Sequence, residues 1–368
     1  MPRILVTGGC GFIGRHVTAE LLENRYNIRI LDGFIDQVHG DAEAAISEEV
    51  EIVRADIRDR TAVREALRDV DGVIHLAAEV GVGQSMYEIE RYVGANDLGT
   101  AVLLESMIGL PVKRIVVASS MSVYGEGRYV TDAGDRVDFV RRTAEQVRAG
   151  LWDLTAADGG RLIPAATDED KPVDLASIYA LTKYAQERQV IIFGEAYGVE
   201  AVALRLFNVF GVGQALSNPY TGVLANFASR LANSQPPLIF EDGRQRRDFV
   251  HVFDVARAFR LALEQQAAPS HVINIGSGNS YTIAEVATLL ANAMGIPEIG
   301  AEILGKARSG DIRNCFADIS RARELLGFEP RHRLESSLGP FTKWVRSTSA
   351  VDRSAEMKRQ LEKRGLVS

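Results

Sequence analysis

The sequence has very little cysteine, since Cys10 and Cys315 are the only two in 368 residues. That number excludes a disulfide framework and a cysteine-based zinc site. Long apolar runs are also missing, because no hydrophobic stretch reaches the ~18 residues of a membrane-spanning helix. The start, MPRILVTGG, lacks the basic, apolar and cleavage-site stretches of a signal peptide. We therefore expect a reduced, soluble, cytoplasmic protein with no membrane partner and no metal.

Positive charge is not in excess either. The net charge is −7, from 42 Lys and Arg against 49 Asp and Glu. Nucleic acids and anionic membranes bind to basic surfaces, so neither is expected as the main partner. The chain does have an ordinary globular composition, 46% hydrophobic and 25% charged, and a length that suits about two domains.

Short apolar segments alternate with segments of helical period up to about residue 120. The strand-like segments, rich in Val and Ile, are RILVTG, IRILD, VEIVRAD, GVIHLAA and RIVVASS. Helical spacing lies between them, at residues 12–22, 62–67 and 100–107. This alternation predicts βαβ units and a parallel sheet that is buried on both faces.

The later part of the chain predicts shorter, mixed elements. We expect a helix around 179–197, strands at VEAVALRLF, PLIF and HVINIG, and helical segments at 282–294 and 325–344. The fold class is therefore α/β, a doubly wound parallel sheet with a smaller mixed C-terminal lobe. The expected division is a dinucleotide-binding domain at 1–205, a substrate-binding lobe at 206–345 with some chain returning to the sheet, and a tail at 346–368. The charged, weakly helical tail is interpreted as solvated or as an oligomer contact.

One segment inside the first domain, an insertion at about 126–171, fits this pattern poorly. It is polar and rich in Gly and Asp, with only a short helical pattern near 143–151. A loop of this length inside a compact domain is uncommon and is usually either functional or disordered.

The first strand runs into a glycine-rich turn, TGGCGFIG. Gly8, Gly11 and Gly14 form a G-x-x-G-x-x-G variant of the dinucleotide-binding fingerprint, at the start of a predicted helix. Such a turn lets the backbone approach a pyrophosphate, and the free N–H groups of the helix start bind the anion. The glycines alone could be a mere strand–helix turn. Asp32, which ends the second strand where a ribose-binding acid belongs, favours a Rossmann fold that binds NAD rather than NADP.

Hydroxyl groups end the strand VVASS, and a tyrosine–lysine pair follows on a later helix. Tyr179 and Lys183 have the spacing i, i+4, which puts both on one helix face. Taken alone, such a pair is often only a solvated face. A nearby ammonium lowers the pKa of a tyrosine, whose phenolate can then take a proton from a sugar hydroxyl while hydride leaves the same carbon.

Together these motifs resemble the extended short-chain dehydrogenase/reductase superfamily, in its NAD-dependent nucleotide-sugar epimerase/dehydratase branch. The resemblance covers about residues 3–345. It is carried by TGGCGFIG, Asp32, ADIRD, IHLAA, SSMSVYG, YALTK, LRLFNVFG, DGRQRRDFVHVFDVA and SGDIRNCFAD, in that order. It implies that Ser120 is the catalytic hydroxyl, Tyr179 the general base, and Lys183 the residue that binds the nicotinamide ribose.

The same resemblance implies two sets of binding residues. The set for NAD is Gly8, Gly11, Phe12, Ile13, Gly14, Asp32, Gly33, Asp56, Ile57, Leu76, Ala77, Ala78, Asn96, Tyr179, Lys183 and Phe207. The set for the substrate is Ser120, Met121, Asn208, Asn218, Arg247 and Arg308. The two arginines suit a nucleotide diphosphate, because a guanidinium can grip it bidentately. We expect a nucleotide-diphosphate sugar as substrate and a homodimer as the assembly.

Met121 and Ser122 restrict the type of reaction that the site can catalyse. Related 4,6-dehydratases carry an Asp-Glu pair at these positions to move protons during loss of water, and neither residue here can do so. Dehydration is therefore disfavoured. What remains is oxidation at C4, rotation of the keto-sugar and return of the hydride to its other face, which is epimerisation.

The identity of the sugar stays open between two families. GQALSNPYTGV, QPPLIFEDGRQRRDFVHV and the long insertion most resemble the dTDP-L-rhamnose 4-epimerases, which interconvert dTDP-L-rhamnose and dTDP-6-deoxy-L-talose. UDP-hexose 4-epimerases share every catalytic residue and are the alternative. A keto-sugar reductase would usually take NADPH, which Asp32 disfavours. A non-enzymatic NAD-binding scaffold would tend to lose the Ser–Tyr–Lys set, which is complete here.

Overall fold

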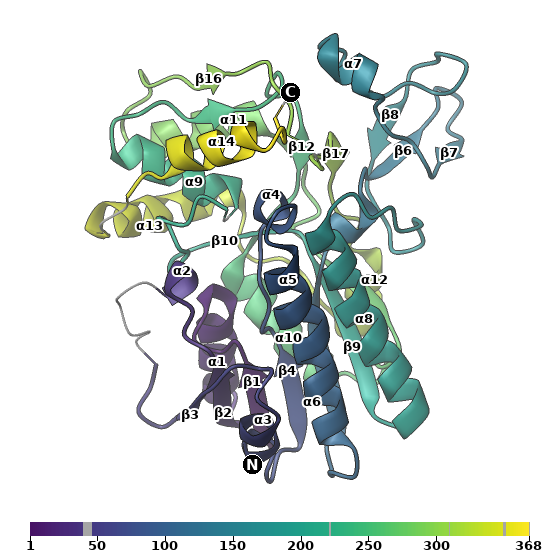
Figure 1. The fold of residues 1–368 in the computed structure, drawn as a ribbon, viewed down its shortest axis with the longest axis vertical. Helices are drawn as coiled ribbons and strands as arrows, with labels where there is room; N and C mark the ends of the chain where they lie inside the picture. Colours follow the sequence, from purple (N-terminus) through teal and green to yellow (C-terminus); the bar gives the residue numbers. More distant parts are fainter. Residues whose placement is uncertain (40–45, 221, 309, 349–350, 368) are drawn as a thin grey trace.

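The centre of the fold is a seven-stranded parallel sheet with the order β14–β9–β5–β4–β1–β2–β3 (Figure 1). The computed structural model describes residues 1–39, 46–220, 222–308, 310–348 and 351–367. The strands of this sheet are β1 (Arg3–Thr7), β2 (Asn27–Asp32), β3 (Glu51–Arg54), β4 (Gly72–His75), β5 (Arg114–Ser120), β9 (Glu200–Leu206) and β14 (Val272–Ile275). The order reverses between β1 and β4, as in a doubly wound Rossmann sheet, and this confirms the predicted fold class.

Helices cover both faces of the sheet, because each strand points alternate side chains to opposite sides. In β1, Ile4 and Val6 join the core on one face, and Leu5 joins the core on the other. The first face is covered by α1 (Phe12–Glu23), α10 (Val252–Glu264) and α12 (Ser320–Leu326). The second face is covered by α3 (Arg60–Ala66), α6 (Gly99–Met107) and α8 (Ile178–Tyr197).

The carboxyl ends of the parallel strands share one edge of the sheet, where a crevice forms at the point of strand reversal. Thr7 at the end of β1 pairs with His75 of β4, and Ser120 at the end of β5 pairs with Leu206 of β9. The segments that follow these strands contain short helices. They are α2 (Asp36–His39), α4 (Val82–Ser85), α5 (Ile89–Tyr92), the π-helix η1 (Val93–Leu98) and the 3-10 helix η2 (Met121–Tyr124).

A smaller mixed lobe packs beyond this edge around its own apolar core. Its helices are α9 (Val223–Ala232), α11 (Ile283–Ala293) and α13 (Leu334–Ser347). Its strands form small sheets of β10 (Asn208–Phe210) with β13 (Phe249–His251), β11 (Leu238–Ile239) with β16 (Glu302–Ile303), and β12 (Arg246–Arg247) between β15 (Tyr281–Thr282) and β17 (Asn314–Cys315). The limits at residues 205 and 345 stay a prediction, since α10, β14 and α12 pack with the main sheet.

The helical segment predicted at 325–344 is wrong as a single element. The helix α12 ends at Leu326, and Gly327 follows in the left-handed conformation with φ of 62°. Pro330 lies in the gap before α13, which begins at Leu334. A left-handed glycine with a proline shortly after it is a common way to end a helix.

The insertion is more ordered than its sequence pattern indicates. It forms a three-stranded antiparallel sheet of β6 (Arg128–Val130), β7 (Arg136–Val137) and β8 (Ile163–Ala165). The short helix expected near 143–151 is present as α7 (Ala144–Arg148), with Thr143 and Gln146 in a capping box. Tyr129, Leu154 and Leu162 are buried together as its small core. In Figure 1 this unit stands out beside the smaller lobe.

The C-terminal segment is not a solvated tail. It forms the helix α14 (Ser354–Lys363), which lies across the smaller lobe in Figure 1. The exposed fraction is 7% for Met357 and 1% for Leu361, so the inner face of the helix is buried against this same chain. The interpretation as a solvated tail is therefore corrected, and the interpretation as an oligomer contact stays a prediction.

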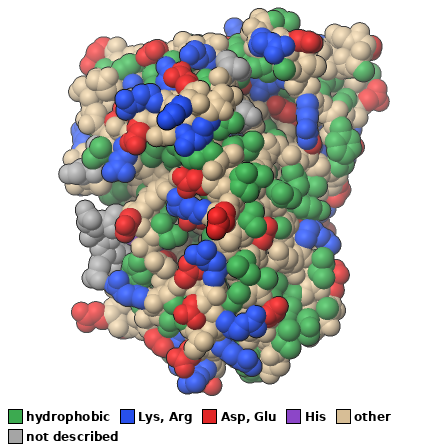
Figure 2. All heavy atoms as spheres, in the orientation of Figure 1, with side chains coloured by type: hydrophobic (Ala, Val, Ile, Leu, Met, Phe, Trp, Pro, Cys, Tyr) green, Lys and Arg blue, Asp and Glu red, His purple; other side chains and the backbone are tan. Residues whose placement is uncertain are grey.

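The surface carries charges of both signs. Figure 2 shows Lys and Arg side chains interspersed with Asp and Glu over the face in view. Within the described residues, no helix is long and apolar enough to span a membrane. The same part of the chain holds no cluster of His, Cys, Asp or Glu suited to a metal ion. Cys10 and Cys315 are both buried as free thiols.

Candidate active site

Two cavities open at the carboxyl edge of the sheet and meet at Tyr179. The first, the glycine-loop cavity, has a volume of about 430 Å³ and is lined by the turn at Gly8–Gly14 and by Asp32. The second, the arginine cavity, has a volume of about 320 Å³ and is lined by Arg247 and Arg308. The residues that line both are Val80, Ser120, Tyr179, Leu206, Phe207, Asn208 and Gly222.

The glycine-loop cavity has a backbone floor that fits a dinucleotide. Gly8 has φ of 69°, and a Cβ on it would lie 2.9 Å from the Ala77 nitrogen. A Cβ on Gly14 would lie only 2.2 Å from the Gly8 oxygen. A side chain at either position would clash with the backbone and disrupt the turn. With glycine at both positions, the N-terminus of α1 faces the cavity. This is the arrangement that a pyrophosphate needs.

Asp32 lies at the wall of this cavity with a well-held carboxylate. It accepts hydrogen bonds of 2.9 Å from the backbone N–H groups of Cys10 and Phe34, and His39 Nε2 lies 3.5 Å from its Oδ1. Burial alone would raise its pKa, but the contact with His39 and the backbone bonds hold that pKa below the usual value. Arg58 also lines the cavity, yet its guanidinium bonds the carboxylate of Asp56. An ionised Asp32 suits ribose hydroxyls.

The structure brings the predicted NAD residues together, with one exception. Those that line the glycine-loop cavity are Gly8, Gly11, Phe12, Ile13, Gly14, Asp32, Gly33, Asp56, Ile57, Leu76, Ala77, Ala78, Tyr179, Lys183 and Phe207. Asn96 is 0% exposed and lies behind the wall. Its Oδ1 accepts from the Glu79 N–H at 2.7 Å, and its Nδ2 donates to Thr182 at 2.8 Å. Asn96 therefore supports the wall and does not line the cavity.

Both adjacent serines line the glycine-loop cavity, and Ser120 also lines the arginine cavity. Ser119 donates its hydroxyl to Glu187 at 2.7 Å, and Arg205 grips the same carboxylate with two bonds. That buried ion pair fixes the end of β5. Ser120 accepts from the Ser122 hydroxyl at 3.0 Å and contacts the phenol of Tyr179.

Tyr179 and Lys183 lie on one face of α8, as predicted, but their electrostatics differ from the prediction. Burial raises the pKa of Tyr179, and its bond with Ser120 offsets this only in part. Burial also lowers the pKa of Lys183 to about 7. The Lys183 ammonium donates to Gln186 Oε1 at 2.6 Å. The predicted lowering of the Tyr179 pKa is therefore wrong for the protein without bound cofactor or substrate, because desolvation raises this pKa by more than the bond with Ser120 lowers it.

In the arginine cavity, both predicted guanidiniums are held in place. Arg247 donates through Nη1 to the backbone oxygens of Arg246 and Arg313, at 2.8 and 2.9 Å. Arg308 donates to Asp311 at 2.8 Å and lies 4.5 Å from the ring centre of Phe240. Two positively charged side chains in one cavity suit a diphosphate.

The other predicted substrate residues divide between the cavities. Met121 lines the arginine cavity, and Ser120 and Asn208 line both. Asn218 lines only the glycine-loop cavity, where its Oδ1 accepts from Gln37 at 3.2 Å. Gln214 and Ala215 line the same cavity, and the role of Asn218 in substrate binding stays a prediction.

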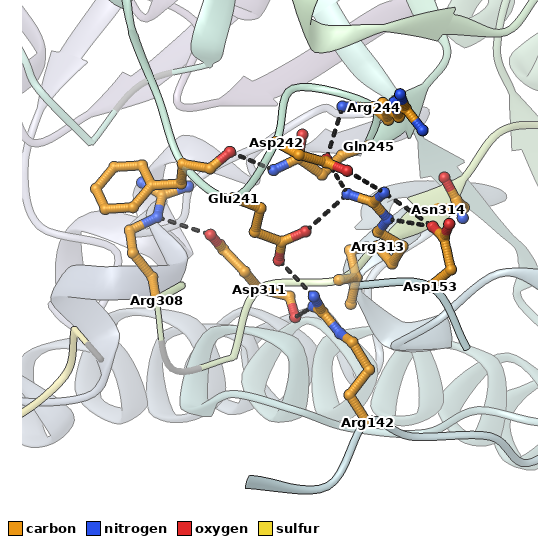
Figure 3. Close-up of polar contacts among 12 residues, drawn as sticks. Arg142, Asp153, Glu241, Asp242, Arg244, Gln245, Arg308, Asp311, Arg313 and Asn314 are labelled. Atoms are coloured by element: carbon orange, nitrogen blue, oxygen red, sulfur yellow. Dashed lines mark hydrogen bonds and ion pairs between the residues drawn. The ribbon is translucent and has the colours of Figure 1, made fainter. Parts of the chain in front are cut away.

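An ionic network joins the insertion to the wall of the arginine cavity (Figure 3). Arg142 from the insertion bonds Glu241 Oε1 at 2.6 Å and the backbone oxygen of Asp311 at 3.2 Å, and both partners line the cavity. Arg313, which is 1% exposed, bonds Glu241 from the other side at 3.0 Å and also bonds Asp153 of the insertion at 2.8 Å. The insertion therefore helps to hold in place the two segments that carry Arg247 and Arg308.

Sequence reasoning missed several residues at these cavities. Ser354, Met357 and Leu361 of α14 line the arginine cavity, and their i, i+3 and i, i+7 spacing in a charged segment was the available signal. Ser85 accepts the backbone N–H of Tyr179 at 3.0 Å and fixes the start of α8. Nothing in the sequence marks Ser85, because its role depends on the packing of α4 on α8.

Comparison with known proteins agrees with this geometry. Residues 4–145 and 153–276 match the NAD dependent epimerase/dehydratase family. The dTDP-L-rhamnose 4-epimerase of Burkholderia thailandensis is 36% identical over 350 residues, which are 93% of this chain and 94% of the relative. The putative UDP-glucose 4-epimerase of Methanocaldococcus jannaschii is 33% identical, over 94% of this chain and 99% of the relative.

Among solved structures, the UDP-glucuronic acid 4-epimerase of Bacillus cereus, in complex with UDP-glucuronic acid and NAD, matches with a TM-score of 0.78. The two sequences are 27% identical, and the match covers 94% of this chain and 99% of the other. The combined sequence and structural matches are with enzymes that use NAD on nucleotide sugars. The chain therefore belongs to the NAD-dependent epimerase/dehydratase family and is a nucleotide-sugar 4-epimerase with NAD as its cofactor.

Proposed function

We propose that this 4-epimerase interconverts dTDP-L-rhamnose and dTDP-6-deoxy-L-talose. The observation that carries the reaction type is the meeting of the two cavities at Ser120 and Tyr179. The nucleotide sugar is supported by the 36% identity to the dTDP-L-rhamnose 4-epimerase, against 33% to a putative UDP-glucose 4-epimerase. The expected homodimer and cytoplasmic location stay predictions.

The cofactor residues proposed above hold NAD between the glycine turn and Lys183. The N-terminus of α1 binds the pyrophosphate, Asp32 accepts from the ribose of the adenosine, and Lys183 binds the ribose of the nicotinamide. When bound, NAD supplies a reversible hydride acceptor for C4 of the sugar. Asp32 disfavours the 2′-phosphate of NADP by charge repulsion.

The proton transfer is assigned to Tyr179. Tyr179 lines both cavities, so a sugar in the arginine cavity can present its C4 hydroxyl to it. Tyr179 takes the proton of that hydroxyl as the C4–H bond breaks, and gives it back after the sugar has turned. Ser120 donates to the C4 oxygen and keeps it oriented. Since burial raises the pKa of Tyr179, the positive charge of the nicotinamide ring would favour its phenolate when NAD is bound, whereas the negative diphosphate of the substrate would not.

Rotation of the keto-sugar requires that the diphosphate stays bound while the sugar turns. Arg247 and Arg308 are proposed to hold the diphosphate, with Asn208 beside them. Met121 and Ser122 line the same cavity and carry no group that moves protons on carbon. The site therefore supports inversion at C4 and disfavours loss of water.

A panel of dTDP- and UDP-sugars, with NMR of the products, tests the proposal. We expect dTDP-L-rhamnose to give dTDP-6-deoxy-L-talose, with UDP-glucose and UDP-galactose converted much more slowly. Conversion of UDP-glucose to UDP-galactose at the higher kcat/KM would replace the proposed substrate with the UDP-hexose alternative. Release of a reduced sugar with consumption of NADH would instead point to a reductase.

A further inference from the structure

The C-terminal helix α14 contributes one wall of the arginine cavity. Ser354, Met357 and Leu361 lie three and four residues apart, which places them on one helix face, and all three line the cavity. The opposite face is charged and exposed, and Figure 2 shows Lys and Arg side chains gathered over the position of α14. The helix is amphipathic, and its apolar face points into the substrate site.

Contacts on both sides hold α14 over the cavity. On the side of the smaller lobe, Asn226 of α9 donates to Ser354 at 3.0 Å, and Arg230 pairs with Asp352 at 2.9 Å. On the opposite side, the Arg364 guanidinium lies 4.2 Å from the ring centre of Tyr87. These contacts give the inner side chains a fixed position.

Leu361 packs on the segment at residues 80–85, which lies next to the junction of the two cavities. A Cβ on Gly83 would be only 3.4 Å from Leu361 Cδ2, so the leucine packs directly on that segment. The same segment contains Ser85, which bonds the backbone of Tyr179, and Val80, which lines both cavities. Ser354 lies at the other end of α14, beside Asn226. Met357 and Leu361 are therefore the part of α14 nearest the reacting sugar.

We propose that Met357 and Leu361 form the subsite for the substituent on C5 of the sugar, and that this subsite selects a methyl group over a hydroxymethyl group. The assignment rests on the proposed function and deepens it. Neither side chain offers a hydrogen-bond donor, so a hydroxyl buried against them loses its water without replacement. A methyl group gains by the same burial. Discrimination of this kind is worth roughly 10- to 200-fold in kcat/KM.

A matched pair of substrates tests the subsite in the full-length enzyme. dTDP-L-rhamnose and dTDP-L-mannose differ only in having methyl or hydroxymethyl on C5. We expect the wild type to favour the methyl sugar, and Leu361→Gln to reduce that ratio of kcat/KM values by roughly tenfold or more. Leu151→Gln, at an exposed position of the insertion, is the matched control and should leave the ratio unchanged. An unchanged ratio in Leu361→Gln would overturn the assignment.

A second variant and an inhibition measurement distinguish a C5 subsite from a purely structural role of α14. Met357→Gln is close to isosteric, and it replaces Leu361→Gln in the comparison if the latter loses NAD or thermal stability. Inhibition by free dTDP should be unchanged in both variants, because the diphosphate residues are intact. A general fall in dTDP affinity with a constant sugar ratio would show that α14 only stabilises the lobe, and would overturn the proposal.

The test also separates this inference from the proposed function. If the wild type converts neither dTDP sugar, the proposed function fails, and the same variants are measured on UDP-6-deoxyglucose and UDP-glucose. A ratio that shifts in Leu361→Gln on this pair still supports the C5 subsite. A ratio that does not shift rejects the subsite, whichever nucleotide the enzyme uses.

Discussion

The two cavities that meet at Tyr179 are built in different ways. The glycine-loop cavity is lined mainly by the turns that directly follow β1, β2, β3 and β4 and by the end of β5. The arginine cavity is lined by α9, residues 238–247, Arg308, residues 310–312 and α14, which only tertiary packing brings together. A site made from strand ends leaves a compact motif in the sequence. A site made from distant segments leaves scattered residues whose meaning depends on the fold.

The two cavities also differ in the groups that are proposed to contact the ligands. Backbone groups and one buried carboxylate, Asp32, dominate the proposed cofactor contacts. The proposed substrate contacts are long cationic side chains, Arg247 and Arg308, which are positioned by carbonyl groups and by a network that reaches into the insertion. Substitutions should therefore distinguish the two cavities. Some should stop the reaction, some should weaken substrate binding alone, and some should change cofactor binding alone.

The largest effect is expected at the junction of the cavities. Tyr179→Phe removes the proposed proton acceptor, so kcat should fall by about 10²–10⁴-fold while NAD stays bound. The measurement is single-turnover kinetics together with the NAD content of the purified enzyme. Tyr197→Phe, an exposed tyrosine on the same helix, is the control. Lys183→Ala should damage both turnover and NAD retention. A Tyr179→Phe enzyme with nearly wild-type kcat would remove Tyr179 from the mechanism.

The next effect should be confined to the arginine cavity. Arg247→Ala and Arg308→Ala each remove a charged hydrogen-bond donor, so KM for the nucleotide sugar should rise by roughly 10- to 100-fold. Retention of NAD should not change. Arg244→Ala provides a matched control, because Arg244 is exposed in the same segment and does not line the cavity. If neither variant changes KM, the diphosphate binds elsewhere.

The matching change in the glycine-loop cavity concerns the choice of cofactor. Asp32→Ser removes the charge that would repel a 2′-phosphate, so binding of NADP relative to NAD should improve by roughly tenfold or more. Asp36→Ser, an exposed acid on α2, should leave the ratio as it is. Titration of the cofactor-free protein with NAD and NADP measures both affinities. A constant ratio in Asp32→Ser would show that another group excludes NADP.

The smallest effect is expected from the insertion. Arg142→Met leaves Glu241 with one fewer partner and loosens the segment behind Arg308, so KM should rise by about two- to tenfold with little change in kcat. Arg148→Met, at an exposed position of α7, controls for the loss of charge. A fall in kcat at constant KM, or no change in either, would argue against a positioning role for Arg142.

Sequence reasoning succeeded where structure is set locally. The glycine turn, Asp32 and the i, i+4 pair Tyr179–Lys183 follow from strand ends and helix period, and the structure places all of them at one crevice. It failed where tertiary packing determines the local structure. The sheet of the insertion has strands of two and three residues, too short to show a period.

The remaining errors have physical causes of the same kind. Burial, which a sequence does not reveal, reverses the expected pKa shift of Tyr179. The charged composition of α14 hides Met357 and Leu361, whose environment depends on where the chain returns. Asn218 lies within the predicted substrate-binding lobe, yet it lines the glycine-loop cavity, so its role in substrate binding stays a prediction.

Solvent isotope incorporation tests the central claim, inversion at C4 without proton exchange on carbon, most directly. dTDP-L-rhamnose is incubated with the enzyme in D₂O, and the product is analysed by mass spectrometry and NMR. The account predicts dTDP-6-deoxy-L-talose without carbon-bound deuterium, because the hydride returns to C4 and the proton handled by Tyr179 sits on oxygen and washes out. Deuterium on C5 of the product would contradict it, because it would show proton exchange beside the 4-keto carbon, and Met121 and Ser122 carry no group for that step.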